Sequence, residues 1–294
     1  MEGPKTPINR VKSVQDVCIP ASPFMKKIGF GTGVAVYEMK RSPITNQSNS
    51  PWAVKKVLSK NKSNPEAFVK DIDGRHILAM EECSNCLGDL IEECTEPFPS
   101  KTITKVTFDV SKALEYLHNH SLLMHCDVKS YNILIKGDFN VCKLCDFGVC
   151  LPVTKTGELN EEKAGSEAEY IGTAAWSAPE ILKFPQEITT KADIYAFGLV
   201  IWEMIALMPP ADEEFVNSFN NLSFDEEVSE DSLDLSATGK TRKRPPLPDF
   251  DLTDDYNLIL EVFFICTEDD KSKRPTAKDL TAILTHINKH SQLK

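Results

Sequence analysis

Four short motifs in a fixed order constrain the fold of this chain more than any other feature of its sequence. They are Ala53-Val54-Lys55, His125-Cys126-Asp127-Val128-Lys129-Ser130-Tyr131-Asn132, Asp146-Phe147-Gly148 and Ala178-Pro179-Glu180. A glycine-rich turn within residues 28–36 precedes them, and alone it would be weak evidence, because glycine suits any tight turn. The complete set has a negligible chance of arising at random, so we interpret the motifs together.

The spacing of apolar residues predicts two unlike parts. From Phe24 to Met80, short apolar runs between turn residues predict strands, and Asp73-Gly74 between two such runs predicts an antiparallel hairpin. After about residue 87 the spacing is helical, and four helices are expected at residues 102–118, 193–207, 261–267 and 277–287. The expected fold class is α+β, with a small antiparallel β lobe followed by a larger, mainly helical lobe.

Shifts in composition mark the expected boundaries. Residues 1–21 are polar, contain three prolines and show no periodicity, so we expect a flexible N-terminal tail. One domain is expected over residues 22–290, with the small lobe at 22–82 and the large lobe at 83–290. An acidic insert at 211–239 and a C-terminal tail at 291–294 complete the expected organisation.

The acidity of the chain comes from one segment. The formal net charge is −11, and residues 211–239 hold nine Asp and Glu without any Lys or Arg. Outside that segment the chain is nearly neutral. A general nucleic-acid binder needs a basic face, so we expect no nucleic-acid partner.

Cysteine usage and hydropathy predict an intracellular protein without a membrane span. Nine cysteines are an odd number, and no signal-peptide pattern opens the chain, which argues against a secreted disulfide framework. The longest apolar run, residues 194–208, has 15 residues and contains Glu203, whereas a span needs about 20 apolar residues. We expect a buried helix there, and a cytoplasmic protein. The basic run at residues 240–244 leaves the nucleus open as a second compartment, although a solvated turn is the favoured interpretation.

The ordered motifs resemble those of the eukaryotic protein kinases over about residues 24–290. The most specific part is H-x-D-x-K-x-x-N followed by D-F-G and A-P-E, and Lys129 is the form found in serine/threonine kinases. The resemblance implies a bilobal protein kinase fold. It also implies an ATP-dependent enzyme that transfers the γ-phosphate of Mg-ATP to serine or threonine hydroxyls of protein substrates, with tyrosine as an alternative acceptor.

The same resemblance implies roles for individual residues. Asp127 would accept the proton of the substrate hydroxyl and Lys129 would contact the γ-phosphate, so both are expected catalytic residues. Asn132 and Asp146 would hold Mg²⁺, a hard ion that prefers oxygen ligands. The expected ATP-binding residues are Ile28, Gly29, Phe30, Gly31, Thr32, Gly33, Val36, Ala53, Lys55, Met80, Glu81, Cys83 and Leu134.

Two further positions follow from the family pattern in the second half of the chain. Thr173 is expected to lie near Asp127, in the segment where a peptide substrate docks. Glu180 and Arg274 are expected to form a buried structural ion pair without a catalytic role.

Several other segments resemble the PDZ-binding kinases, also called T-lymphokine-activated-killer-cell-originated kinases, a family similar to the mitogen-activated kinase kinases. They lie at residues 21–25, 31–34, 50–56, 90–93 and 135–139. This resemblance implies mitotic or mitogen-activated signalling. The terminal Ser291-Gln292-Leu293-Lys294 does not fit a PDZ ligand, so that partner is not carried over. Thr6, followed by Pro7, is a candidate site for an upstream proline-directed kinase, although a plain turn is the favoured interpretation.

The chain departs from the family pattern in the small lobe. Only 24 residues lie between Lys55 and Met80, where kinases fit a further strand and the helix called αC, on the order of 50 residues in all. That helix carries the glutamate that pairs with the strand lysine, and Glu66 fits the entry to the expected hairpin better than this role. A catalytically impaired scaffold or nucleotide-binding module is therefore the alternative function.

Two smaller departures and one cysteine pattern also bear on the expected chemistry. Val34 stands at the third glycine of the glycine-rich loop, which is compatible with activity. Cys126 replaces the arginine that receives an activation-loop phosphate, so phosphorylation at Thr154, Thr156 or Ser166 cannot act through the usual pair. Finally, Cys83-x-x-Cys86 and Cys142-x-x-Cys145 have zinc-ligand spacing, but residues 142–145 alternate along a strand, so a zinc site is not expected.

Overall fold

The computed structural model describes residues 25–31, 34–39, 52–57, 69–70, 76–81, 83–165, 168–183, 185–211 and 244–291. It divides into two compact units, Met1–Glu82 and Cys83–Lys294, and each is described here by itself. The expected acidic insert lies outside the described residues except for Ala211, and the N-terminal tail lies outside them entirely.

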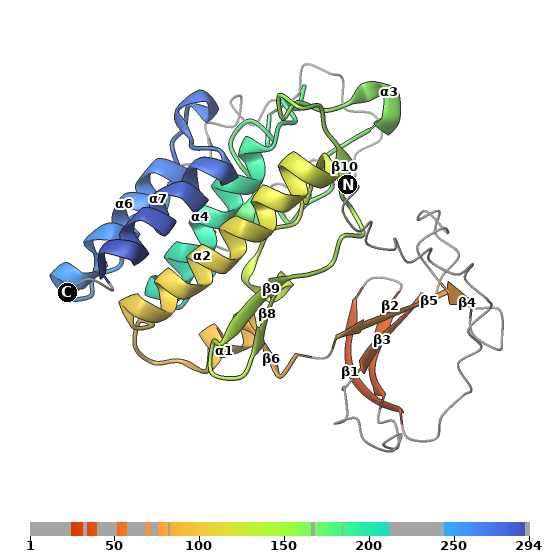
Figure 1. The fold of residues 1–294 in the computed structure, drawn as a ribbon, viewed down its shortest axis with the longest axis horizontal. Helices are drawn as coiled ribbons and strands as arrows, with labels where there is room; N and C mark the ends of the chain where they lie inside the picture. Colours follow the sequence, from red (N-terminus) through yellow and green to blue (C-terminus); the bar gives the residue numbers. More distant parts are fainter. Residues whose placement is uncertain are drawn as a thin grey trace, which may run out of the picture. The chain divides into compact units, whose positions relative to one another are not determined.

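The described residues of the first unit form one antiparallel sheet of five strands (Figure 1). The strands are β1 (Met25–Gly31), β2 (Val34–Met39), β3 (Trp52–Val57), β4 (Val69–Lys70) and β5 (His76–Glu81), in the spatial order β1-β2-β3-β5-β4. The register shifts between Lys27 and Gly29, where a bulge interrupts the pairing of β1 with β2. Such a bulge adds twist to the edge of a sheet.

The hairpin expected around Asp73-Gly74 is confirmed by the pairing of its strands. In β4 and β5, Val69 lies opposite Ile77 and Lys70 opposite His76. Residues 71–75, which contain the turn, lie outside the described residues. The described part of this unit holds strands alone, and residues 58–68, which connect β3 to β4, are not among the described ones.

Helices dominate the second unit, which is the larger of the two. The α-helices among its described residues are α1 (Leu87–Glu93), α2 (Ser100–Tyr116), α3 (Glu161–Ala164), α4 (Lys191–Ala206), α6 (Asn257–Cys266) and α7 (Ala277–Ser291). Two small antiparallel sheets accompany them. One has the order β6-β8-β9 and is built from Asn85–Cys86, Ile133–Lys136 and Val141–Leu144, and the other pairs β7 with β10, Leu123–Met124 and Leu151–Pro152.

Helix α4 lies at the centre of the helical core. All of its residues from Ala192 to Ala206 are buried, as expected for a helix that is apolar on every side. Helices α2 and α6 pack against it, and α7 packs on α2 (Figure 1). The helix ends at Leu207, whose positive φ of 57° stops the helical hydrogen-bond pattern.

The expected fold class is confirmed, with an antiparallel β unit followed by a mainly helical one. All four predicted helices are present, and their ends differ from the prediction by up to four residues. The largest local difference follows α2, where Leu117–Ser121 form a π-helical turn. Among the described residues no helix combines the length and the hydropathy that a membrane crossing requires.

Candidate active site

One buried carboxylate, that of Asp193, binds the backbone at the start of the segment from His125 to Asn132. Asp193, in the first turn of α4, has no exposed surface. Its Oδ2 accepts a hydrogen bond of 2.7 Å from the backbone N–H of His125, and its Oδ1 accepts one of 3.0 Å from that of Cys126. The His118 Nε2 lies 2.8 Å from the same Oδ2. These bonds fix the backbone immediately before Asp127.

The π-helical turn after α2 supplies the third partner of Asp193. His118 lies in that turn, and Leu122 ends it with a positive φ of 52°. A π-helical turn is rare and inserts one extra residue per turn, which changes the direction in which side chains leave the helix. Burial alone would raise the pKa of Asp193, but the His118 contacts and the His125 amide outweigh burial and lower the pKa overall.

The carboxylate of Asp127 is held by three side chains. Its Oδ1 accepts a hydrogen bond of 2.6 Å from the Thr173 hydroxyl, and its Oδ2 lies 2.8 Å from the Lys129 Nζ. The Asn132 Nδ2 donates to the same Oδ2 at 2.9 Å and to the Asp127 carbonyl at 2.7 Å. Lys129 also donates to the Thr173 hydroxyl at 2.8 Å, so Asp127, Lys129 and Thr173 form a closed triangle.

This environment keeps Asp127 ionised at neutral pH. Partial burial raises its pKa, but the bonds from Lys129, Thr173 and Asn132 together outweigh burial, so that the pKa lies below its ordinary value. An ionised carboxylate that is oriented by three donors can accept a proton from a hydroxyl placed beside it. The Thr173 contact agrees with the expectation from the family pattern.

His125 connects this loop to the segment that carries Asp146. Its Nε2 lies 2.9 Å from the Cys145 carbonyl, and its Nδ1 accepts the Asp127 N–H at 3.2 Å. The Cys145 N–H in turn donates to the Asn132 carbonyl at 2.9 Å. The His125 ring also meets the Phe147 ring edge to face, with centroids 5.3 Å apart. Residues 145–147 and the 125–132 loop therefore form one hydrogen-bonded assembly.

Two residues of this assembly have backbone angles that are unusual outside glycine. Cys126 and Asp146 have φ values of 67° and 66°. Such angles cost energy in a residue with a β-carbon and persist where the surrounding structure holds them, most often at functional sites. Burial raises the pKa of the Cys126 thiol, so this fully buried residue stays uncharged. It therefore cannot replace an arginine as a receptor for phosphate.

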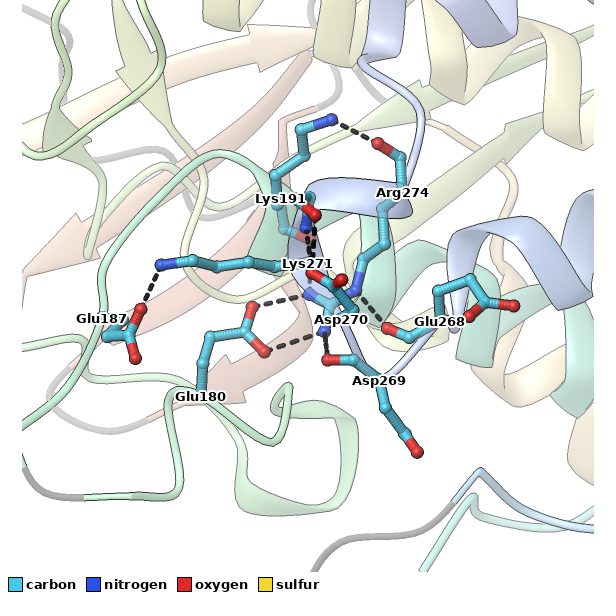
Figure 2. Close-up of polar contacts among 9 residues, drawn as sticks. Glu180, Glu187, Lys191, Glu268, Asp269, Asp270, Lys271 and Arg274 are labelled. Carbon is cyan, nitrogen blue, oxygen red and sulfur yellow. Dashed lines mark hydrogen bonds and ion pairs between the residues drawn. The ribbon is translucent and has the colours of Figure 1, made fainter.

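The expected ion pair between Glu180 and Arg274 is present (Figure 2). The two Arg274 Nη atoms donate to the two Glu180 oxygens at 2.6 and 2.8 Å, and its Nε donates to the Glu268 carbonyl at 2.6 Å. Arg274 is 1% exposed, and its guanidinium lies 4.7 Å from the centroid of the Tyr195 ring. Bidentate pairing satisfies the buried charge and fixes the position of the segment that follows Thr173.

In the first unit, the sheet register relates several of the expected ATP-binding residues. Val36 lies opposite both Gly29 and Lys55, and Ala53 lies opposite Met80. Cross-strand partners, and residues two apart along a strand, share one face of a sheet. Strand β1 includes Ile28, Phe30 and Gly31, strand β5 ends at Glu81, and Thr32 and Gly33 lie outside the described residues.

Two other expected residues of this group, Cys83 and Leu134, belong to the second unit. Leu134 lies on β8, opposite Cys86 of β6. Ser84 follows Cys83 and donates from its backbone to the Ile135 carbonyl at 3.1 Å, which ties the start of this unit to β8.

Sequence reasoning did not assign roles to two acids of α4. The sequence places Asp193 only at the start of an expected helix, and Glu203 only as an acid within an apolar run. The available signal was chemical, because an acid in a helix that is apolar on every side cannot reach water. Such an acid must be either neutral or hydrogen-bonded. Among the described residues, no group of three or more His, Cys, Asp and Glu has a geometry that could hold a metal ion.

Comparison with known proteins agrees with this arrangement of motifs. A family model for the protein kinase domain matches residues 66–286 of the chain. The chain belongs to the protein kinase family. The match includes the loop with Asp127, the Asp146 segment and the Glu180–Arg274 pair, and it begins after β3.

Curated relatives of the kinase include several named serine/threonine kinases. The human lymphokine-activated killer T-cell-originated protein kinase is 39% identical over 304 residues, which covers 92% of each chain. The mitogen-activated protein kinase kinase kinase ANP1 of Arabidopsis thaliana is 29% identical over 80% of this chain and 32% of its own length. The serine/threonine-protein kinase mos of Patiria pectinifera is 31% identical over 48% of this chain and 39% of its own.

These matches confirm the expected enzyme class, a protein serine/threonine kinase, and the resemblance to the T-lymphokine-activated-killer-cell-originated kinases. The alignment with the human relative extends over 304 residues, whereas this kinase has only 294. The relative therefore contains residues that have no counterpart here. ATP use, typically with Mg²⁺, follows from the kinase domain.

Proposed function

We propose that this kinase is catalytically active and transfers the γ-phosphate of Mg-ATP to serine or threonine hydroxyls of protein substrates. The observation that supports the proposal is the closed triangle of Asp127, Lys129 and Thr173. It combines an ionised base with a cation two residues away along the chain. A chain that served only as a scaffold would have no physical need for this arrangement.

In the proposed reaction, Asp127 receives the proton of the substrate hydroxyl as the oxygen attacks the γ-phosphorus. The phosphorus–oxygen bond to ADP breaks, and ADP leaves. Lys129, held beside Asp127 at 2.8 Å, neutralises negative charge on the transferred group. Thr173 orients the carboxylate through its Oδ1. Because positioning supplies most of the rate in phosphoryl transfer, fixed hydrogen bonds matter more here than covalent chemistry.

Asn132 and Asp146 are the proposed Mg²⁺ ligands. Both offer hard oxygen atoms, which Mg²⁺ prefers. The Asn132 nitrogen is committed to Asp127 through two hydrogen bonds, so its amide oxygen is the atom that can face a cation. Bound Mg²⁺ would neutralise the phosphates. The ATP-binding residues proposed in the first unit are those on β1, β2, β3 and β5, with Lys55 as the cation for the α- and β-phosphates.

The place of this kinase in the cell is also a proposal. The names of the relatives refer to mitogen-activated and killer-cell kinases, and we propose a role in mitogen-activated or mitotic signalling in the cytoplasm. The catalytic domain would comprise residues 22–290. Thr6 remains the proposed site for an upstream proline-directed kinase, and tyrosine the alternative acceptor.

The alternative is a catalytically impaired kinase-fold scaffold, and the connection between β3 and β4 favours it. Strand β3 ends at Val57 and β4 begins at Val69, so residues 58–68 must contain any counterpart of the helix that pairs with Lys55. If all 11 of these residues were helical, they would form only about three turns, and no residue would remain to link the helix to the strands. The intact metal and base residues favour the active enzyme.

Phosphorylation of a general substrate such as myelin basic protein by the purified chain tests the proposal. Asp127→Asn removes the base but preserves the hydrogen-bonding shape, and we expect a rate at least about 100-fold lower. Tyr116→Phe, a change at a side chain that is 64% exposed, serves as the matched control and should leave the rate unchanged. Equal rates for the wild type and Asp127→Asn would support the scaffold instead.

A further inference from the structure

The backbone of Tyr170, three residues before Thr173, is held by a side chain from a later loop. The Tyr170 N–H donates a hydrogen bond of 3.0 Å to the Gln186 Oε1. A backbone N–H can only donate, so Gln186 presents its amide oxygen to this contact. Tyr170 is 7% exposed, and a buried donor that loses its acceptor costs more than the bond itself contributes. Gln186 therefore supplies an acceptor that the Tyr170 backbone needs.

Gln186 lies in a loop that is itself fixed. The N–H of the next residue, Glu187, donates to the Glu180 carbonyl at 3.2 Å. Glu180 is held in turn by its bidentate pair with Arg274 (Figure 2). The backbone beside Gln186 is thus tied to a buried ion pair, which makes Gln186 a firm support for the Tyr170 segment.

Ile171, which follows Tyr170, turns an apolar side chain to solvent near the candidate base. It is 67% exposed. The residue before it is held by Gln186, and two residues after it the Thr173 hydroxyl donates to Asp127 at 2.6 Å. Apolar surface of this kind gains stability when a partner covers it. A protein substrate whose hydroxyl reaches Asp127 is the partner that comes closest to Ile171.

We propose that Gln186 is a positioning residue for protein substrates, because its bond to the Tyr170 N–H sets the direction in which Ile171 meets an apolar side chain of the substrate. The inference rests on the proposed function. Gln186 touches neither the substrate nor the reacting atoms. Its loss should therefore weaken the binding of protein substrate and leave the binding of ATP unchanged.

Amide hydrogen exchange in the full chain tests the contact without requiring activity. Gln186→Leu removes the acceptor, and the Tyr170 amide should exchange about three- to tenfold faster than in the wild type. Gln186→Glu keeps an oxygen acceptor at the same reach and should stay within about twofold of the wild type. Equal exchange in the wild type and Gln186→Leu would contradict the inference.

Steady-state kinetics with myelin basic protein test the consequence for the substrate. Gln186→Leu should raise the KM for this protein about three- to tenfold, with kcat and the KM for ATP within about twofold of the wild type. Gln186→Glu should restore the low KM. An equal rise in the KM for ATP would mean general damage to the fold, and the positioning role would be wrong.

Glu187→Ala is the matched control in the same loop. The Glu187 side chain is 63% exposed and pairs with Lys271, and alanine keeps the backbone N–H that reaches Glu180. This variant should leave kcat and both KM values unchanged. If Glu187→Ala raises the KM for myelin basic protein as much as Gln186→Leu, the effect belongs to the loop and not to the Tyr170 contact.

A double variant tests whether Gln186 acts through Ile171. Ile171→Ser removes the exposed apolar side chain and should by itself raise the KM for myelin basic protein about three- to tenfold. If the two residues act on one contact, Gln186→Leu combined with Ile171→Ser should raise this KM no more than the larger single effect. Multiplied effects would show that Gln186 does not act through Ile171.

The outcomes separate this inference from the proposed function. If the wild type is active and Gln186→Leu has an unchanged KM for myelin basic protein, the positioning role alone is wrong. If the wild type matches Asp127→Asn, the proposed function fails and the positioning role fails with it. The exchange of the Tyr170 amide still shows in that case whether Gln186 holds the segment.

Discussion

At the scale of single residues, Asp127 and Glu203 show how two environments give two carboxyl groups opposite charge states. The Asp127 carboxylate is bonded by three donors, one of which is the Lys129 cation, and its pKa is lowered. Glu203 is more deeply buried and has neutral donors, the Ser130 hydroxyl and the Trp176 indole N–H, and its pKa is raised. One acid is therefore suited to accept a proton and the other to remain buried without charge.

The raised pKa of Glu203 predicts a pH-dependent stability. The group has an ordinary pKa of 4.5 and a folded-state pKa of about 8, so the folded chain binds more protons than the unfolded chain between these values. The stabilisation is complete below the lower value and is lost as pH rises through the higher one. Relative to Glu203→Gln, the wild type should lose unfolding free energy between pH 5 and pH 8, as measured by urea denaturation. A difference independent of pH would contradict this assignment.

The Glu180–Arg274 pair supports a second prediction at this scale. Arg274 is almost fully buried and Glu180 is 8% exposed, so Glu180→Gln leaves a buried guanidinium without a counter-charge. We expect a loss of about 3–5 kcal/mol of unfolding free energy, measured by chemical denaturation.

The neighbouring pair of Lys271 with Glu187 provides the control (Figure 2). These side chains are 32% and 63% exposed, and exposed pairs contribute at most about 1 kcal/mol. Lys271→Ala should therefore have a small effect. Equal losses for the two variants would mean that burial does not set the strength of these ion pairs.

At the scale of elements, α4 organises the candidate site along its length. Asp193 and Glu203 are ten residues apart, or about 15 Å along a helix. The first holds the start of the catalytic loop and the second holds Ser130 and Trp176. The apolar spacing predicted this helix correctly and also its burial, because a helix that is apolar on every side has no face suited to water.

The segment before Thr173 depends on a close approach of backbones. A β-carbon at Gly172 would lie 2.4 Å from the Cys126 carbonyl oxygen and 2.4 Å from the Tyr170 ring, too close for any side chain. We expect Gly172→Ala to displace Thr173 and to lower the melting temperature. The rate of phosphorylation should fall by about tenfold or more.

Gly165 is the matched control for that substitution. It has a φ of 88°, but a β-carbon there would meet no atom within 4 Å, so Gly165→Ala tests backbone strain alone, at a cost of about 1–2 kcal/mol. A wild-type rate for Gly172→Ala would show that the Thr173 segment does not need this contact.

Some features at the element scale could not be predicted from apolar spacing. The π-helical turn at Leu117–Ser121 continues the apolar stripe of α2, so the spacing predicts an uninterrupted helix. What differs is the hydrogen-bond pattern and the direction of His118, and both depend on the contact with Asp193. The short strand β4 was recognised through the Asp73-Gly74 signal, because turn chemistry is local.

At the scale of the whole molecule, the chain consists of two units that differ in architecture: the first is an antiparallel sheet and the second is mainly helical. The second unit contains the described hydrophobic core, with α4 at its centre, and it also holds Asp127, Lys129, Asn132 and Asp146. The first unit carries the glycine-rich strand pair and Lys55 on an antiparallel sheet. Strand β3 ends at Val57 and β4 begins at Val69, and this interval is shorter than the kinase pattern leads one to expect.

The sequence by itself determined the fold class, the family and the residues with candidate chemistry, because motif order and apolar periodicity are properties of the linear chain. The tertiary structure decided how those residues are held. Asp193 and Glu203 are more than 60 residues from the loop that they anchor. The hydrogen-bond partners of a buried acid depend on which groups folding brings within about 3 Å, and spacing along the sequence does not contain that information.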